Sequence, residues 1–218
     1  MNNYTKIKHI CFDLDGTLVN SSKTIYLATI EALEKLSLSS NLAEEKFSGM
    51  IGKHFVDIFN ELNIYLPDFK EFISIYKSVY FNFIDKSILY NHVEETLDYF
   101  NDNEVKVSLL TTKAQDQADK IINHFNLNDK MNYIMGRRDG IAHKPSPEPL
   151  LKICGELKID TAETLMVGDT DLDIQCGKNA KAKTCGVLYG YRTKEQIEKE
   201  KPDFIISNLG ELLSLDIK

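Results

Sequence analysis

From Ile88 onward the chain alternates short apolar runs with helical patterns, and this alternation limits the possible folds more than any other feature. It is typical of a parallel sheet with helices on both faces, because parallel strands need a long crossover that a helix supplies. Strands are predicted at Ile7 to Asp13, Val105 to Thr111, Asn132 to Met135, Thr164 to Val167, Lys183 to Val187 and Asp203 to Ile206. Helices are predicted at Val93 to Asn101, Gln115 to Phe125, Pro147 to Leu157, Asp171 to Asn179, Thr193 to Glu198 and Leu209 to Leu213.

Residues 21–86 follow a different pattern, in which one helix succeeds another and no strand is predicted. The longest apolar stripe with helical spacing consists of Phe69, Phe72, Ile73, Tyr76, Val79, Tyr80 and Phe83. Such a stripe packs against other apolar faces, and shorter stripes from Ile25 and from Phe55 supply them. We therefore expect an α/β fold, a Rossmann-like parallel sheet flanked by helices, with a small helical bundle inserted after the first strand. The predicted domains are residues 1–20 with 87–218, and residues 21–86.

Composition and charge narrow the functional classes. Of the 218 residues, 43% are hydrophobic and 27% are charged, as in ordinary globular proteins. The formal net charge of -7 argues against nucleic acid or an anionic membrane as a partner, because both require basic surfaces. The first apolar run is broken at Asp13, too early for a signal peptide, so a cytoplasmic location is expected. Four scattered cysteines argue against zinc and against disulfides, and reduced, buried thiols are expected.

The first predicted strand ends in two aspartates, Asp13 and Asp15, followed by Gly16 and Thr17. Because side chains alternate along a strand, both carboxylates leave the strand end on the same side, too close to remain as unpartnered anions. A hard divalent cation such as Mg²⁺ takes oxygen ligands and tolerates one or two carboxylates together with phosphate oxygens. The alternative is an acidic strand-to-turn junction, since aspartate and glycine also favour turns.

Other polar residues follow the predicted strands. In an open parallel sheet, ligands bind outside the carboxyl ends of the strands, so these residues are expected at one edge. They are Thr111-Thr112-Lys113, Lys144-Pro145 in a later loop, and Gly168-Asp169 with Asp173. Carboxylates, a hydroxyl and a lysine at one sheet edge are typical of a phosphate site that holds a metal.

The residues Asp13-Leu14-Asp15-Gly16-Thr17, Thr111, Lys144-Pro145 and Gly168-Asp169 with Asp173 resemble, in order, the four motifs of the haloacid dehalogenase-like phosphohydrolases. The resemblance covers the whole chain and implies that the helical insertion is a cap domain. Gly190-Tyr191-Arg192 is similar to a Gly-Tyr segment of the phosphoglycolate phosphatase-like branch. Thr112 is a departure, because many relatives carry Asn at this position.

The resemblance implies a nucleophile and a proton carrier. Asp13 would attack phosphorus and form an aspartyl-phosphate, which divides one difficult hydrolysis into two easier steps. Asp15 would donate a proton to the leaving alcohol and later accept one from water. Asp13, the backbone carbonyl of Asp15, and Asp169 would bind Mg²⁺, with Asp173 holding a metal-bound water or a ligand.

The remaining motif residues would contact the phosphate. Thr111 would donate its hydroxyl, Thr112 or Lys113 a further hydrogen, and Lys144 a fixed positive charge that also offsets repulsion among the aspartates. In the predicted cap, Lys53 and His54 could reach a substrate carboxylate, or they could belong to a solvated helix start.

The implied function is a Mg²⁺-dependent phosphatase for a small phosphorylated metabolite, with phosphoglycolate as the first guess. Sugar phosphates, nucleotides and pyrophosphate are the next candidates, and the chain would act as a monomer or homodimer. Dehalogenases lack the second aspartate, so Asp15 disfavours that branch. A phosphomutase is the alternative, although mutases carry a histidine where this chain has Ile25. A non-catalytic binding protein on the same fold is the third possibility.

Overall fold

Two compact units make up the structure, which is a computed structural model that describes residues 6–38 and 42–215. One unit contains Met1–Leu18 and Leu89–Lys218, and the other is Val19–Ile88. The boundaries predicted from the sequence lie after residue 20 and before residue 87. Short strands β2 (Val19–Asn20) and β3 (Ile88–Leu89) form a two-stranded sheet of their own. The sequence predicts no strand at either place, because two residues are too few for a periodic pattern.

A six-stranded parallel sheet in the order β5-β4-β1-β6-β7-β8 forms the centre of the first unit. The strands are β1 (His9–Phe12), β4 (Lys106–Ala114), β5 (Tyr133–Arg137), β6 (Thr164–Gly168), β7 (Lys183–Val187) and β8 (Phe204–Ile206). This confirms the predicted parallel α/β fold. One prediction needs correction: β4 continues past Thr111 to Ala114, with an irregular register against β5 between Leu110 and Ala114.

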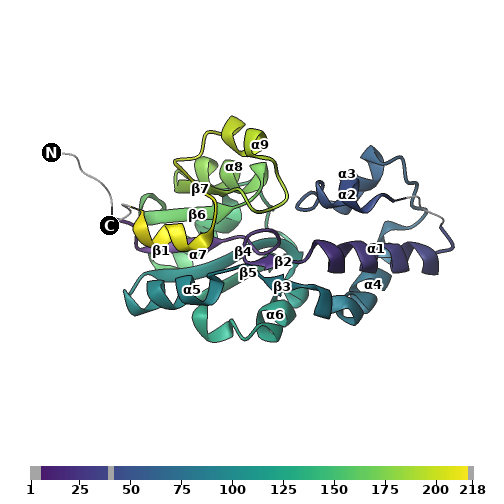
Figure 1. The fold of residues 1–218 in the computed structure, drawn as a ribbon, viewed down its shortest axis with the longest axis horizontal. Helices are drawn as coiled ribbons and strands as arrows, with labels where there is room; N and C mark the ends of the chain where they lie inside the picture. The colour runs from purple at the N-terminus through teal and green to yellow at the C-terminus, as the bar shows by residue number, and fades with distance from the viewer. Residues whose placement is uncertain (1–5, 39–41, 216–218) are drawn as a thin grey trace. The chain divides into compact units, whose positions relative to one another are not determined.

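The helices of this unit cover both faces of the sheet. They are α5 (Val93–Asp102), α6 (Gln115–His124), α7 (Glu148–Leu157), α8 (Asp171–Asn179) and α9 (Lys194–Lys199). In Figure 1, α5 and α6 lie below the sheet and α8 lies above it. The unit also contains the short 3₁₀ helices η2 (Asn128–Lys130), η3 (Thr161–Glu163) and η4 (Leu209–Ser214). The last helix predicted from the sequence is therefore η4, a 3₁₀ helix and not an α-helix.

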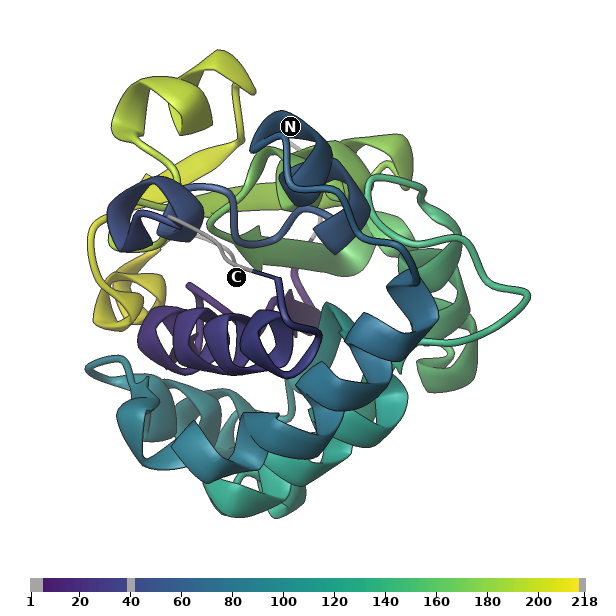
Figure 2. The ribbon, with the colours of Figure 1, turned by 90° about the vertical axis from the view of Figure 1, so that its right-hand side faces the viewer.

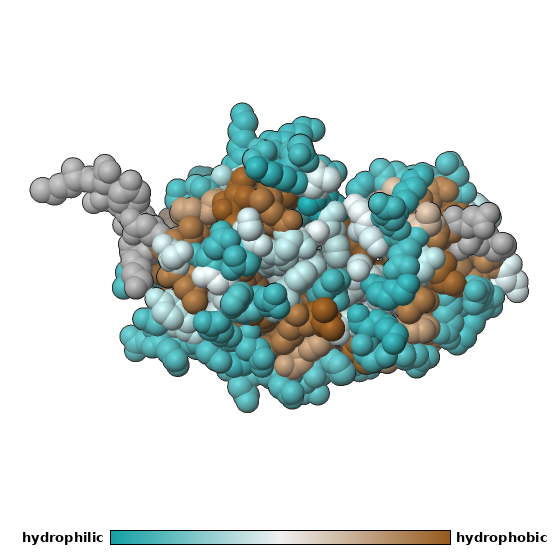
Figure 3. All heavy atoms as spheres, viewed as in Figure 1, coloured by the Kyte–Doolittle hydropathy of each residue, from teal (hydrophilic) through white to brown (hydrophobic). Residues whose placement is uncertain are grey.

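Hydrophobic burial explains why these segments fold as they do. All four residues of β1 are fully buried, because β4 and β6 flank the strand and helices cover both faces. At the surface, hydrophilic side chains cover α9 at the top of Figure 3. Only Ile197 of that helix is buried, and it packs against Gly186 of β7. The four cysteines are buried free thiols, as predicted.

His9 is a buried polar residue of β1 whose two ring nitrogens both have partners. Nδ1 lies 3.1 Å from the Thr164 hydroxyl, and Nε2 lies 2.7 Å from the Ser108 hydroxyl. A neutral imidazole satisfies both contacts, donating at one nitrogen and accepting at the other. Burial lowers the pKa of His9 from its usual 6.5 to about 4, because a protonated ring would lose its hydration.

This shift predicts an acid-dependent loss of stability. The unfolded chain binds a proton at His9 near pH 6.5 and the folded chain does so only near pH 4, so stability falls as the pH falls through this window. The loss attributable to His9 amounts to about 3 kcal/mol. Urea unfolding between these pH values should show this slope, and His9→Gln should remove much of it. Equal slopes for the two proteins would contradict the assignment.

The second unit is helical. Its elements are α1 (Ser22–Lys35), α2 (Glu44–Ser48), α3 (Phe55–Glu61), α4 (Phe69–Tyr80) and η1 (Phe81–Lys86). Helices α1 and α4 lie side by side in both views (Figures 1 and 2). Asp68 caps α4 by accepting the backbone N–H groups of Lys70 and Glu71.

Aromatic side chains form much of the core of the helical unit. Phe59 and Phe72 meet edge to face with centroids 4.9 Å apart, and Phe55 and Tyr76 meet at 4.8 Å. Of the predicted α4 stripe, Phe72, Tyr76, Val79 and Tyr80 are buried, whereas Phe69 and Ile73 are partly exposed. Among the described residues, no helix combines the length and the hydropathy that a membrane span requires.

Candidate active site

The carboxyl ends of the central strands bring the predicted residues together within the first unit. Asp13 follows β1 directly, Thr111 lies in β4, and Asp169 follows β6. Since the strands are parallel and β1 lies between β4 and β6, these residues share one edge of the sheet. The backbone N–H of Asp13 donates to the carbonyl of Val167 at 2.9 Å, which continues the β1–β6 pairing as far as the aspartate.

Lys144 links the buried carboxylates. Its side chain is only 3% exposed, and its Nζ lies 2.5 Å from Oδ1 of Asp13 and 2.5 Å from Oδ1 of Asp173. The ammonium also donates to the backbone carbonyl of Leu110 at 3.1 Å. Its three hydrogens therefore have three acceptors, so the charge is both buried and fully hydrogen-bonded.

The charges at this edge perturb one another. Burial alone would lower the pKa of Lys144, but Asp13 and Asp173 outweigh that effect and raise it, so the lysine remains protonated. Burial raises the pKa of Asp13 well above its usual range, and Asp173, Asp169 and Asp15 add to this effect while Lys144 opposes it. The edge therefore holds more negative charge than Lys144 neutralises.

Asp169 is fully buried between two loops. Its Oδ2 accepts the backbone N–H of Tyr191 at 2.7 Å, and its Oδ1 accepts the Thr17 hydroxyl at 3.3 Å. Burial and the nearby Asp173 raise the pKa of Asp169 to about 7, against the opposing effects of the Tyr191 N–H, Arg192 and Lys144.

Asp173 belongs to the first turn of α8 and completes a capping box. Its Oδ2 accepts the backbone N–H of Thr170 at 3.0 Å and the Thr170 hydroxyl at 2.6 Å, which leaves Oδ1 for Lys144. A Cβ at Gly168 would lie 2.3 Å from the Asp173 side chain, so glycine is required there. The start of α8 thus fixes the position of Asp173 against the lysine.

The donor set fits a hard divalent cation. Carboxylate oxygens of Asp13, Asp169 and Asp173 all lie within 4.8 Å of one another, and all three residues are buried. The raised pKa values of Asp13 and Asp169 indicate that this group lacks positive charge. Oxygen ligands and excess negative charge are what Mg²⁺ requires.

Residues 10–187 match the family model of the haloacid dehalogenase-like hydrolases. The chain belongs to this family. A pyrophosphatase PpaX from Halalkalibacterium halodurans is 30% identical over 96% of this chain and 97% of its own. A phosphoglycolate phosphatase from Aquifex aeolicus is 31% identical over 94% and 95%. The crystal structure of a predicted phosphoglycolate phosphatase from Haemophilus somnus 129PT is 27% identical, with a TM-score of 0.83 over 95% of this chain and 97% of that one.

The other predicted site residues of this hydrolase lie nearby or in the second unit. Asp15 is about nine-tenths buried, and its Oδ2 lies 3.3 Å from Nζ of Lys113. Thr111 is buried and its hydroxyl accepts the N–H of Lys113 at 3.2 Å, whereas Thr112 is partly exposed. Thr112 and Lys113 lie within β4, not after it as predicted.

Lys53 and His54 belong to the unit Val19–Ile88, and their role in specificity stays a prediction. Lys53 forms an ion pair with Glu61 of α3, with Nζ 2.8 Å from Oε2. His54 precedes α3 at its amino-terminal end. Lys53 lies two residues before α3, so the contact with a substrate carboxylate and the alternative of a solvated helix start both stay predictions.

Sequence reasoning missed three groups around Asp169 in this hydrolase. They are the Thr17 hydroxyl, the backbone N–H of Tyr191, and Arg192, whose Nε lies 3.0 Å from Oδ1 of Asp171. The resemblance pointed to Gly190-Tyr191-Arg192 but gave the segment no role. Every residue except proline carries a backbone N–H, so the sequence does not mark this one, and only the Gly-Tyr pair could have drawn attention to the segment.

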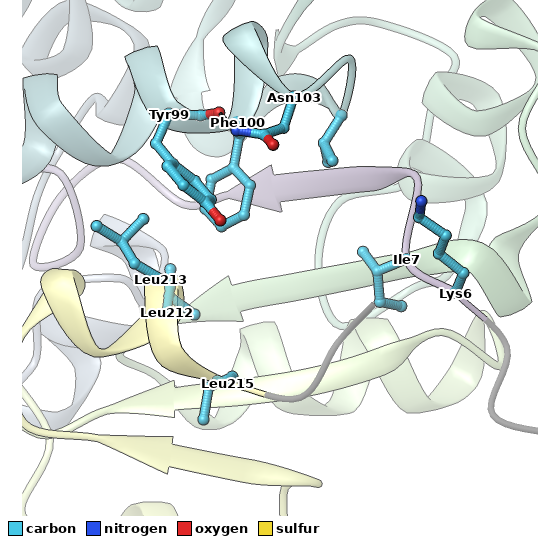
Figure 4. Close-up of a pocket in the computed structure, with 9 residues that line it drawn as sticks. Lys6, Ile7, Tyr99, Phe100, Asn103, Leu212, Leu213 and Leu215 are labelled. Atoms are coloured by element: carbon cyan, nitrogen blue, oxygen red, sulfur yellow. Dashed lines mark hydrogen bonds between the residues drawn. The ribbon is translucent and has the colours of Figure 1, made fainter.

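A cavity of about 170 Å³ lies at the opposite edge of the sheet, next to Ile7 and Val105 at the amino-terminal ends of β1 and β4. Figure 4 shows Tyr99 and Phe100 extending from α5 toward Leu212 and Leu213. Apolar side chains dominate its walls, and none of the motif residues line it. This cavity is therefore separate from the edge of the sheet where Lys144 and the buried carboxylates lie.

Proposed function

We propose that this hydrolase is a Mg²⁺-dependent phosphatase that releases phosphate from a small phosphomonoester through an aspartyl-phosphate on Asp13. The observation that carries the proposal is the buried Lys144, which bridges Asp13 and Asp173 beside Asp169. This arrangement fixes one carboxylate oxygen at the end of β1 and supplies positive charge beside it. Phosphoryl transfer needs this combination of a positioned nucleophile and neutralised charge.

The reaction would proceed in two displacements. In the first, an oxygen of Asp13 forms a bond to phosphorus, the bond from phosphorus to the leaving oxygen breaks, and Asp15 gives its proton to that oxygen. In the second, water attacks the phosphorus of the aspartyl-phosphate, Asp15 accepts a proton from the water, and the carboxylate of Asp13 is released with inorganic phosphate. Asp15 is placed two residues beyond the nucleophile, and its Oδ2 lies 3.3 Å from Nζ of Lys113.

Positive and hydrogen-bonding groups of the chain would stabilise the transferring phosphoryl group. Lys144 would turn one of its hydrogens from Asp13 to a phosphate oxygen while it keeps Asp173 as a fixed partner. The Thr111 hydroxyl lies at the same edge and would donate a hydrogen bond, with Thr112 as a further donor. Such groups act most strongly on charge that spreads over the phosphoryl oxygens in the transition state.

Asp13, Asp169 and the backbone carbonyl of Asp15 would hold the Mg²⁺ ion, with Asp173 beside them. When bound, the ion neutralises phosphate charge and the excess negative charge of the aspartates. These groups lie on two chain segments, one that follows β1 and one that follows β6 and begins α8, so no large rearrangement is needed to assemble them.

Phosphoglycolate is the proposed substrate, supported by the Aquifex aeolicus relative, and pyrophosphate is the second candidate, supported by the relative from Halalkalibacterium halodurans. The two relatives are almost equally similar to this chain, so overall identity does not separate the substrates. We assign the choice to the unit Val19–Ile88, proposed as a cap domain, with Lys53 and His54 as candidate contacts for a substrate carboxylate.

A phosphate-release assay tests this proposal. The purified protein is given phosphoglycolate, pyrophosphate, sugar phosphates and nucleotides in turn, with Mg²⁺ or with a chelator. We expect Mg²⁺-dependent release, fastest with phosphoglycolate, and loss of release with the chelator. Conversion of a sugar phosphate that needs a bisphosphate activator and conserves phosphate would favour the phosphomutase alternative. No release from any of these substrates would leave the non-catalytic alternative.

A further inference from the structure

Asp169 is held by a second chain segment, Tyr189–Arg192, which follows β7 and to which the proposed reaction assigns no role. We call it the 189–192 segment. Its backbone N–H at Tyr191 donates to Oδ2 of Asp169 at 2.7 Å. Because Asp169 is fully buried, this amide replaces a hydrogen bond that water would otherwise make. The segment therefore fixes one of the two carboxylate oxygens directly.

Steric contact holds the same side chain from two directions. A Cβ placed on Gly190 would lie 2.2 Å from Cβ of Asp169, and one placed on Gly16 would lie 2.3 Å from its Oδ2. Gly16 has a φ of +93°, which residues with a side chain rarely adopt, so the backbone conformation also requires glycine at this position. Gly190 has no such φ, so glycine is required there only because the Asp169 side chain leaves no room for a Cβ.

The 189–192 segment is also tied to the loop after β1. The hydroxyl of Tyr189 donates to the carbonyl of Thr17 at 3.0 Å, and the Thr17 side chain in turn donates to Oδ1 of Asp169 at 3.3 Å. The ring of Tyr189 packs against Tyr90 with centroids 4.6 Å apart. Both oxygens of Asp169 are thus set by two loops that contact each other.

The end of the segment is anchored to α8. Arg192 is 5% exposed, and its Nε lies 3.0 Å from Oδ1 of Asp171, the first residue of that helix. Asp169 lies between the anchored segment on one side and the start of α8 on the other. This contact gives Asp171 a partner away from the cluster of Asp13, Asp169 and Asp173.

From these contacts we infer that the 189–192 segment is a positioning element for a divalent cation, with Gly190 and Tyr189 as positioning residues that aim the Asp169 carboxylate. The inference rests on the proposed function, because it concerns the cation that the phosphatase would hold. Loss of a group that orients a metal ligand typically weakens metal binding by about 10- to 100-fold.

The test compares Gly190→Ala with Gly155→Ala in the full chain. Gly155 lies on the exposed side of α7, and a Cβ there would meet nothing within 4 Å, so this variant is a matched control. Binding of Mn²⁺ is measured from the electron paramagnetic resonance signal of the free ion. Gly190→Ala should raise the Mn²⁺ dissociation constant at least about tenfold, whereas Gly155→Ala should leave it at the wild-type value.

A second variant and two further readouts keep the inference distinct from the proposed function. Tyr189→Phe keeps the ring but loses the hydroxyl, and should weaken Mn²⁺ binding about fivefold. At saturating cation the KM for substrate should stay at the wild-type value, and circular dichroism checks the fold. If Gly190→Ala does not fold, Tyr189→Phe decides. Wild-type affinity in every folded variant overturns the inference, whereas a wild type that neither binds Mn²⁺ nor releases phosphate overturns the proposed function.

Discussion

Asp13→Asn is expected to lower phosphate release by at least about 10⁴-fold, because an amide cannot act as the nucleophile that forms the covalent intermediate. The substitution keeps the shape of the side chain and removes one negative charge from the buried cluster of Asp13, Asp169 and Asp173. Burial and three neighbouring carboxylates already disfavour the ionised form of Asp13. The fold should therefore survive, and the loss should lie in kcat.

The measurement is steady-state phosphate release with the substrate and Mg²⁺ at saturation, accompanied by urea unfolding. Asp129→Asn makes the same chemical change at an exposed position in η2 and should keep wild-type activity. Turnover that depends on Mg²⁺ and persists in Asp13→Asn would refute the aspartyl-phosphate mechanism. A collapse of stability in this variant would instead show that the carboxylate is needed for folding.

The sequence predicted the sheet well because its strands are buried on both faces and read as continuous apolar runs, as in β1 and β6. It also predicted which residues meet, because a parallel sheet collects the residues that follow its strands at one edge. It misplaced Thr112 and Lys113, since β4 continues past Thr111 with an irregular register that no periodicity reveals.

The supporting contacts of the site were beyond sequence reasoning for a physical reason. The amide of Tyr191 and the carbonyl of Leu110 are backbone groups that every residue carries, so the sequence does not mark them. The space requirement at Gly190 depends on how close two loops approach. The role of Asp173 was only partly anticipated, because its capping box and its contact with Lys144 use different oxygens of one carboxylate.

Lys144→Met is the second substitution with a large expected effect, and it should destabilise the fold by about 3 to 5 kcal/mol at neutral pH. Methionine is unbranched and of similar length, so it fills much of the space but supplies no charge. Asp13 and Asp173 would then be buried carboxylates that have lost their shared ammonium partner. Loss of the phosphate contact should also lower activity by at least about 10²-fold.

Lys183→Met is the matched control. Lys183 lies 2.9 Å from Oδ1 of Asp203, but its side chain is 54% exposed. Exposed ion pairs contribute about 0 to 1 kcal/mol, because water screens the charges and solvates both partners after separation. Urea unfolding of the two variants therefore separates the loss of a buried charge from the loss of a lysine. Equal stability of the two variants would contradict the assigned role of Lys144.

The pH dependence of Lys144→Met gives a sharper test of the same idea. The pKa of Asp13 already lies above its usual range although Lys144 opposes the shift, so removing the lysine should raise it further. A folded state that binds protons more tightly than the unfolded state gains stability as the pH falls. The deficit relative to wild type should thus be smaller at about pH 5.5 than at about pH 8. Because wild type carries the same His9 effect, the difference between the two proteins isolates the carboxylates, and a deficit that does not change with pH would exclude buried charge as its cause.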